Sequence, residues 1–383
     1  MSEKIWLSSP HMGGNELNYI HKAFEENWVA PLGPNVNEFE LGLENVLNQN
    51  VKVAALSAGT AALHLALIEC GVGYGDEVIC QSMTFSASAN PIAYQGAIPV
   101  FIDSEPETWN ICPLALEQAI ADRISKGKKP KAIVAVHLYG MPFKVDEVLA
   151  IANKYDIPVI EDAAEALGSK YKGVSCGTFG RFGILSFNGN KIITTSGGGA
   201  LVCHSDEDKS KAVFLATQAR DNAPHYQHSQ IGYNYRMSNI CAGIGRGQLE
   251  VLGERVAARR AMTIFYQEIF EEIRGVEVFL EPNENYFSNH WLSAITINEK
   301  EAGFNREDLR LMLLNMNIES RPLWKPMHLQ PVFKDFPYYG NKVSENLFND
   351  GLCLPSGSNL TDLERIKIKT ILETFLNEKS LKI

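Results

Sequence analysis

Short apolar runs alternate with helical patterns between about residues 50 and 205. Ala-rich or amphipathic segments such as AALHLALIEC and VDEVLAIANKY lie between several of these runs. This alternation predicts an α/β domain with a mostly parallel seven-stranded sheet and helices on both of its faces. The expected strands are VAAL (53–56), EVIC (77–80), PVFI (99–102), AIVAV (132–136), IPVI (157–160), GILSF (183–187) and GALVC (199–203).

After these strands the pattern turns helical from about Ser238 to Ile273, and beyond that stretch it changes character. WLSAITIN alternates like a half-buried strand. The chain has 383 residues, too many for one typical domain. We therefore expect a large domain at residues 1–254 and a smaller α+β domain at residues 255–383, connected by one long helix.

Two helices of the smaller domain are expected to begin at capping boxes. In one, Asn305 is followed three residues later by Asp308, and in the other Thr361 is followed by Glu364. In such a pair each side chain accepts a hydrogen bond from the other residue's backbone N–H.

Charge and composition exclude several classes of partner. Formal net charge is -10, spread without a long charged block, so nucleic acid and anionic membranes are not expected as main partners. No stretch approaches a membrane span, and the N-terminal MSEKIWLSSPHMGG lacks the regions of a signal peptide, so we expect a cytoplasmic protein. The seven cysteines are scattered with no C-x-x-C pair, which predicts reduced thiols and no metal site.

Ligands of such sheets bind beyond the carboxyl ends of the strands, so polar residues there are the first candidates for function. The candidates are Ser57 to Thr60, Thr84, Phe85, Asp103, His137, Asp162, Ser186 and Lys191.

Three of these positions suggest chemistry. SAGTAALHLAL opens a helix near Thr60 with small residues, so its free N–H groups can hold phosphate, although a tight turn without a ligand fits as well. Asp162, in EDAAEALGS, can cap a helix over AAEAL or keep a heterocyclic nitrogen protonated. Lys191, in SFNGNKIITTSGGGA, can be a solvated loop lysine or a sequestered amine that forms an imine with a carbonyl.

Together, a phosphate-binding turn, a carboxylate at a strand end and a sequestered lysine are the parts that a pyridoxal phosphate enzyme needs. The motifs SAGTAALHLAL, TFSASANPI, EDAAEALGS, SFNGNKIITTSGGGA and GYNYRMSN resemble, in this order, the DegT/StrS family of nucleotide-sugar aminotransferases. The resemblance runs from LSSPHMGGNE to LPSGSNLT and implies the aspartate aminotransferase-like fold (fold type I), with a three-layer large domain.

The resemblance also implies roles for individual residues. Lys191 bonds covalently to pyridoxal 5'-phosphate and then moves the proton between substrate carbon and cofactor carbon, while Asp162 pairs with the pyridine nitrogen. Gly59, Thr60 and Ser186 hold the phosphate, and Phe85 stacks on the cofactor ring. Asn234 reaches the phosphate of a neighbouring subunit, which implies a homodimer with shared active sites.

Glu165 departs from the pattern of the family. Many relatives carry Gln where this chain has Glu165, so a hydrogen bond from this residue to the cofactor does not transfer directly. An anionic Glu beside phosphate would be unfavourable unless it were protonated or turned away.

Five more residues are candidates for contacts with substrate. Arg220 and Arg321 suit a diphosphate, but either can equally be a structural ion pair. Trp28 can line a sugar-nucleotide pocket or the core, and His328 can lie in the pocket or on the surface. His225 and His228 in APHYQHS have a spacing that could suit a metal ion, but a loop near the substrate or the dimer interface is favoured because the segment has no Cys or carboxylate ligands.

The phrases NWVAPLGPNV, APHYQHS and IESRPLWKPMHLQPVF look most like the branch that acts on UDP-linked 4-keto-6-deoxy amino sugars. This implies that glutamate converts the cofactor to pyridoxamine 5'-phosphate and that C4 of a UDP-4-keto-6-deoxy-N-acetylhexosamine then receives the amino group, for a surface polysaccharide or glycan. A 3-keto or GDP-linked sugar aminotransferase is the alternative within the family. A cofactor-binding regulator without turnover and a metal-dependent hydrolase are alternatives outside it.

Overall fold

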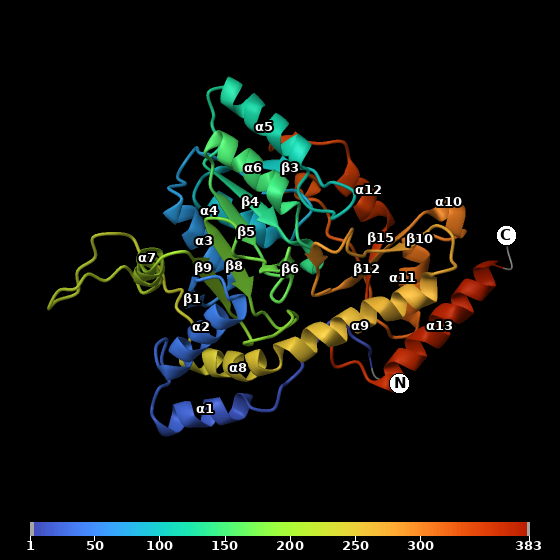
Figure 1. Cartoon of the computed structure of the whole chain (residues 1–383), viewed down its shortest axis with the longest axis horizontal. Coiled ribbons are helices and arrows are strands. Elements are labelled where there is room, and N and C mark those ends of the chain that lie inside the picture. The colour runs from blue at the N-terminus through green and yellow to red at the C-terminus, as the bar shows by residue number, and fades with distance from the viewer. Residues whose placement is uncertain (1–3, 381–383) are drawn as a thin grey trace.

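The computed structural model describes residues 4–380. Its large domain is built on an eight-stranded sheet (Figure 1). The strands, in spatial order, are β1 (Lys52–Leu56), β9 (Gly199–Cys203), β8 (Phe182–Ser186), β5 (Val159–Asp162), β4 (Ala132–Val136), β2 (Glu77–Gln81), β3 (Ile98–Ile102) and β14 (Tyr338–Tyr339). Only β9 runs antiparallel to its neighbours, so the prediction of a mostly parallel sheet that contains all seven expected strands is confirmed.

The eighth strand, β14, was not predicted. It is two residues long and pairs in parallel with β3 at the edge of the sheet. Two residues show no alternation of apolar and polar side chains, so the sequence carries no pattern from which this strand can be recognised.

Helices cover both faces of this sheet because side chains of the strands alternate between two hydrophobic cores. Ala54 and Leu56 of β1 pack with α3, α4 and α7, whereas Val53 and Ala55 pack with α2 and α8. A third cluster joins α5 and α6 to the face that carries Ile79 and Ile133. The helices of this part are α1 (Glu16–Glu25), α2 (Pro34–Leu47), α3 (Gly59–Glu69), α4 (Asn90–Tyr94), α5 (Pro113–Ser125), α6 (Val145–Tyr155), α7 (Asp206–Ala216) and α8 (Asn239–Glu250).

The smaller part of the molecule has a four-stranded antiparallel sheet in the order β10 (Val276–Val278), β12 (Ser293–Ile297), β15 (Gly351–Leu354) and β13 (Arg321–Pro322). Strand β12 confirms the strand expected in WLSAITIN, but the strand is buried on both faces rather than half-buried. Ile295 packs into the core of this part, while Ala294 packs against a cluster of aromatic side chains that includes Trp291. Its helices are α9 (Leu252–Phe270), α10 (Glu299–Ala302), α11 (Arg306–Asn315), α12 (Val343–Asp350) and α13 (Asp362–Ser380).

The helical connection consists of two helices rather than one. Helix α8 ends at Glu250 and α9 begins at Leu252, with Val251 outside helical geometry between them (Figure 1). Both capping boxes are present. The Asn305 side chain accepts from the Asp308 N–H and Asp308 accepts from the Asn305 N–H, and Thr361 and Glu364 exchange the same pair of bonds.

Two segments relate the large sheet to the smaller part. Ile5 bridges to Ile318 and lies in the core of the smaller part, and β14 returns from residue 338 to the large sheet. The boundary at residues 254 and 255 stays a prediction. The remaining short elements are η1 (Ser86–Ser88), η2 (Leu138–Gly140), η3 (Met327–Leu329) and a small sheet of β11 (Tyr286–Phe287), β6 (Lys170–Tyr171) and β7 (Val174–Ser175).

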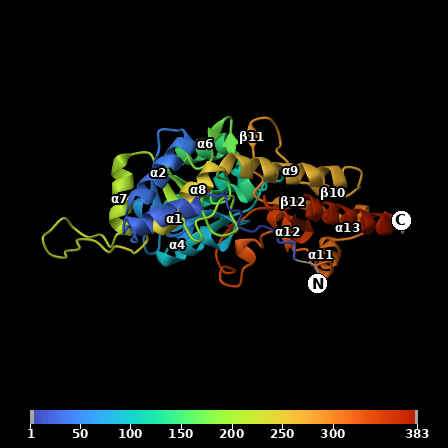
Figure 2. The same cartoon turned by 90° about the horizontal axis from the view of Figure 1, so that it is seen from below.

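The segment between α7 and α8 extends away from both sheets in two perpendicular views (Figures 1 and 2). Two of its large side chains are largely exposed, Tyr226 by 79% and Ile231 by 84%.

Between residues 4 and 380, no helix is both long and apolar enough to cross a membrane.

We expect Gly199→Ala to destabilise the fold, because a Cβ on Gly199 would lie 2.2 Å from the Gly59 nitrogen and 2.4 Å from the Ala58 carbonyl carbon. Backbone cannot move aside as a flexible side chain can, so the free energy of unfolding should fall by about 1–3 kcal/mol. Urea denaturation would measure this loss. Gly197→Ala is the matched control, since a Cβ there would meet nothing within 4 Å; equal stability of the two variants would contradict the expectation.

Candidate active site

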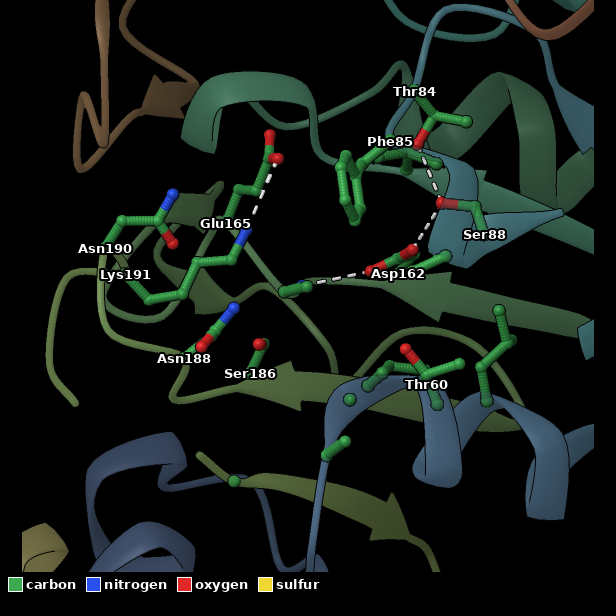
Figure 3. Close-up of a pocket in the computed structure, with 18 of the residues that line it drawn as sticks. Thr60, Thr84, Phe85, Ser88, Asp162, Glu165, Ser186, Asn188, Asn190 and Lys191 are labelled. Atoms are coloured by element: carbon green, nitrogen blue, oxygen red, sulfur yellow. Dashed lines mark hydrogen bonds and ion pairs between the residues drawn. The ribbon is translucent and has the colours of Figure 1, made fainter. Parts of the chain in front are cut away.

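One pocket lies where the carboxyl ends of β1, β2, β5 and β8 meet, and its volume is about 270 Å³ (Figure 3). It brings together residues from segments as far apart in the chain as Ser57 and Trp324. Of the residues predicted for the cofactor site, those that line this pocket are Gly59, Thr60, Phe85, Asp162, Glu165, Ser186 and Lys191.

Lys191 enters the pocket from the turn that follows β8. The turn is closed by a hydrogen bond from the Lys191 N–H to the Asn188 carbonyl (3.0 Å). The Lys191 side chain is only 12% exposed, and its Nζ lies 3.4 Å from Glu165 Oε1. Lys191 is therefore a sequestered amine rather than a solvated loop lysine.

Asp162 is the last residue of β5 and is 7% exposed. Its Oδ2 accepts a hydrogen bond from Ser88 Oγ (2.6 Å), and Ser88 Oγ lies 2.7 Å from Thr84 Oγ1. Its Oδ1 accepts from the Ala164 N–H (3.2 Å). The segment AAEAL forms turns and not a helix, so Asp162 is not a helix cap.

The N-terminus of α3 faces the same pocket. Its N-cap residue, Ala58, has no side chain that can accept a hydrogen bond, and the first bond of the helix runs from the Ala62 N–H to the Ala58 carbonyl (3.1 Å). The N–H groups of Gly59 and Thr60 precede that bond, which leaves them available to an anion at the positive end of the helix. A Cβ on Gly59 would lie 3.2 Å from Ser186 Cβ, so the two predicted phosphate contacts are neighbours.

Glu165 is buried beside Lys191. Its Oε2 accepts a hydrogen bond from the Tyr139 N–H (2.7 Å). Burial raises the pKa of the Glu165 carboxyl above its usual value, while the positive charge of Lys191 and the Tyr139 N–H act in the opposite direction.

These residues fit pyridoxal phosphate. An uncapped helix end suits a phosphate, a carboxylate with two oriented oxygens suits a protonated ring nitrogen, and the Phe85 ring points into the space between them (Figure 3). When bound, pyridoxal phosphate supplies an aldehyde that bonds to amines and a conjugated ring that withdraws electrons. The residues of this pocket would hold the phosphate at the end of α3 and the ring nitrogen at Asp162, and the Lys191 amine would be the group that carries a proton.

The other predicted residues lie outside this pocket of the same chain. Asn234, Arg220 and His225 belong to the extended segment between α7 and α8, where Asn234 bridges to Thr217. The Arg220 guanidinium lies over the ring of Tyr226 in that segment, 4.4 Å from its centroid.

Three further candidates are also placed elsewhere. Trp28 is 38% exposed, so it does not belong to the core. The Arg321 side chain is 64% exposed and forms an ion pair with Glu319 at 2.7 Å, which agrees with the alternative that Arg321 is part of a structural ion pair. His328 Nδ1 lies 2.7 Å from Ser82 Oγ, away from the pocket. Their contacts with substrate stay predictions.

Three lining residues received no role from the sequence. Ser88 occurs in TFSASANPI, but nothing in that motif shows which of its two serines points toward Asp162. Trp291 and Trp324 come from the smaller part of the molecule, and they contact each other at 6.3 Å between ring centroids. Trp324 lies in the phrase IESRPLWKPMHLQPVF and Trp291 in WLSAITIN, but neither phrase shows that its tryptophan lines the pocket, so only the folded arrangement reveals this.

Comparison with known proteins identifies the family. Residues 10–373 match the model of the DegT/DnrJ/EryC1/StrS aminotransferase family. The chain belongs to this family of pyridoxal phosphate-dependent nucleotide-sugar aminotransferases, so it is an enzyme and its cofactor is pyridoxal phosphate.

The similarity to two curated relatives extends over almost the whole chain. EpsN of Bacillus subtilis (strain 168), provisionally named a pyridoxal phosphate-dependent aminotransferase, is 52% identical over 376 residues, which are 97% of this chain and 96% of EpsN. GDP-perosamine synthase of Escherichia coli O157:H7 is 37% identical over 377 residues, 98% of this chain and 99% of that enzyme.

Solved structures confirm the fold class. A DegT/DnrJ/EryC1/StrS aminotransferase from Brucella abortus has a TM-score of 0.87 and 32% identity, covering 94% of this chain and 95% of that one. The pyridoxal phosphate form of the sugar aminotransferase Spr1654 from Streptococcus pneumoniae has a TM-score of 0.88 and 26% identity, covering 98% of this chain and 100% of that one.

We expect Ser88→Ala to weaken cofactor binding, because it removes the O–H that donates to Asp162. Hydrogen bonds to charged groups contribute about 1.5–3 kcal/mol, so the Kd for pyridoxal phosphate should rise roughly 10- to 100-fold. Titration of the cofactor-free protein, followed by absorbance, would measure it. Ser86→Ala is the control, since Ser86 lies on the same short helix but does not line the pocket; an unchanged Kd in Ser88→Ala would contradict this role.

Proposed function

We propose that this enzyme transfers an amino group from glutamate to C4 of a UDP-4-keto-6-deoxy-N-acetylhexosamine, for the synthesis of a surface polysaccharide or glycan. Lys191 is the residue that bonds to the cofactor and carries the proton, and Asp162 is the partner of the ring nitrogen. The observation that carries these roles is the convergence of Lys191, Asp162 and the uncapped end of α3 on one pocket.

The walls of the pocket support a deoxy sugar as the acceptor. Phe85 and Trp324 lie at its opening with ring centroids 5.8 Å apart, and Trp291 adds a third ring. Aromatic faces suit the C–H surfaces of a sugar and the methyl group that replaces the hydroxyl at C6. Asn188 and Asn190, in the turn before Lys191, add amide groups that can bind the remaining hydroxyls.

For the nucleotide of the substrate, GDP is the main alternative to UDP. The phrases NWVAPLGPNV, APHYQHS and IESRPLWKPMHLQPVF support a UDP-linked sugar, whereas the relatives named GDP-perosamine synthase support a GDP-linked one. A 3-keto sugar is the second alternative, because the aromatic walls do not by themselves distinguish C3 from C4.

We further propose that two chains form a homodimer with shared active sites. The extended segment between α7 and α8 supports this, since Tyr226 and Ile231 are exposed on a projection that does not cover its own chain (Figure 2). Asn234 and Arg220 lie in that segment, outside the pocket of their own chain. In a dimer they can reach a phosphate or diphosphate in the pocket of the partner.

The proposal predicts a cycle that can be followed by absorbance. Glutamate should bleach the band of the bound cofactor, and UDP-4-keto-6-deoxy-N-acetylglucosamine should restore it. Lys191→Ala should lower the rate of this cycle by at least about 100-fold, since it removes the group that transfers the proton.

A GDP-linked 4-keto-6-deoxyhexose and a 3-keto sugar are the comparison substrates. If either restores the band and the UDP sugar does not, the chemistry stands and the substrate assignment is wrong. If Lys191→Ala cycles at the rate of the wild type, the assignment of Lys191 is wrong.

A further inference from the structure

The amine of Lys191 lies between a carboxylate and an aromatic ring. Its Nζ is 3.4 Å from Glu165 Oε1 and 4.0 Å from the centroid of the Trp291 ring. Figure 3 shows the Lys191 side chain extending into the pocket, with its amine beside the Glu165 carboxyl group. A carboxylate and the face of an indole both attract a cation, and both do so more strongly where water is scarce.

We propose that Glu165 and Trp291 form a holding site for the protonated amine of Lys191 whenever that amine is not bonded to the cofactor. Glu165 is then a positioning residue that favours the charged form of Lys191, and it is not a ligand of the cofactor phosphate. This inference rests on the proposed role of Lys191.

Glu165 is held so that one oxygen faces the lysine. Its Oε2 accepts the Tyr139 N–H at 2.7 Å, and its backbone carbonyl accepts from Asn289 Nδ2 at 2.9 Å. Tyr139 has a φ of 54°, a backbone conformation that few side chains adopt and that surrounding contacts must maintain. One such contact is the Trp324 N–H, which donates to the Tyr139 hydroxyl at 2.9 Å.

Trp291 is held by the same surroundings. Its Nε1–H donates to the Asn190 carbonyl at 2.7 Å, and its backbone N–H donates to Asn289 Oδ1 at 2.8 Å. Asn289 is fully buried, so one side chain holds the backbones of both Glu165 and Trp291. Nothing in this arrangement needs to move for the Lys191 amine to be received.

The other ionisable groups leave the pairing of Glu165 with Lys191 intact. Asp162 is the second carboxylate, and its two oxygens already accept from Ser88 and from a backbone N–H. Burial raises the pKa of the Tyr139 hydroxyl and of the Cys353 thiol, so both groups are neutral near pH 7. Glu165 is therefore the carboxyl group that the Lys191 amine faces.

The test uses cofactor-free protein, so that it does not depend on amino transfer. Acetic anhydride acetylates an amine only when the amine is uncharged. Mass spectrometry of the peptide that contains Lys191 therefore gives the labelling rate of Lys191 at each pH. In Glu165→Gln the amide oxygen can still accept the Tyr139 N–H, but the charge is lost. Because the carboxylate beside the amine is then gone, Lys191 should label roughly tenfold faster near neutral pH in this variant.

Two further variants separate charge from packing. Glu117→Gln removes a carboxylate that pairs with Lys154 on the surface at 2.6 Å, and it should leave the labelling curve of Lys191 in place. Glu165→Asp keeps the charge and should return the curve toward that of the wild type.

A Glu165→Gln curve that coincides with that of the wild type would overturn the proposal. So would a Glu165→Asp curve displaced as far as that of Glu165→Gln, because the effect would then come from packing. If amino transfer to a sugar fails while the labelling result is as expected, the fault lies with the proposed substrate and not with the holding site.

Discussion

The pairing of Gly199 with the last residues of two strands is the constraint on which the site depends. In the sheet, Gly199 is opposite Leu56 at the end of β1 and opposite Ser186 at the end of β8. Because β9 is antiparallel to both neighbours, the chain leaves β1 and β8 at the same level and on the same edge. The turn that opens α3 and the turn of Lys191 are therefore adjacent, although about 130 residues separate them in the sequence. A side chain larger than hydrogen at Gly199 would displace the turn that opens α3, because it would overlap the backbone of Ala58 and Gly59.

Two buried carboxyl groups three residues apart have different surroundings, and this difference gives them different orientations. Asp162 ends a strand, so its position is set by the sheet, and a hydroxyl and a backbone N–H orient its oxygens. Glu165 follows in a turn, where its position is set by Tyr139 and Asn289. One carboxylate is thus directed toward the middle of the pocket, and the other toward the amine of Lys191 (Figure 3).

The sequence was sufficient for those features that local pattern determines. Seven strands, the capping boxes at Asn305 and Thr361, and the places of Asp162 and Lys191 at strand ends all follow from residues that are close together in the chain. The break at Val251 did not follow, because the residues around it have helical periodicity on both sides and only the packing of the two helices distinguishes them. Strand β14 did not follow either, because an edge strand of two residues depends entirely on the neighbour with which it pairs.

The site itself was predicted only on the side that the large sheet builds. Trp291 lies just before a strand of the smaller part, and its sequence context, WLSAITIN, reports the strand and not the pocket. Its arrival beside Lys191 depends on long-range contacts that no local pattern encodes.

These long-range contacts link the arrangement of the two parts of the molecule to the chemistry of the lysine. The Asn190 carbonyl, one residue before Lys191, accepts from Trp291 Nε1 and from Ser8 Oγ at 2.7 and 2.8 Å. Arg259 of α9 donates to the Trp291 carbonyl and to Ser8 Oγ, and it is fully buried. A shift of the smaller part would therefore displace two things at once: the Trp291 ring, which lies beside the Lys191 amine, and the backbone of the turn that carries Lys191. In this fold one hydrogen-bonded network joins the turn of Lys191 to the packing of the smaller part against the large sheet.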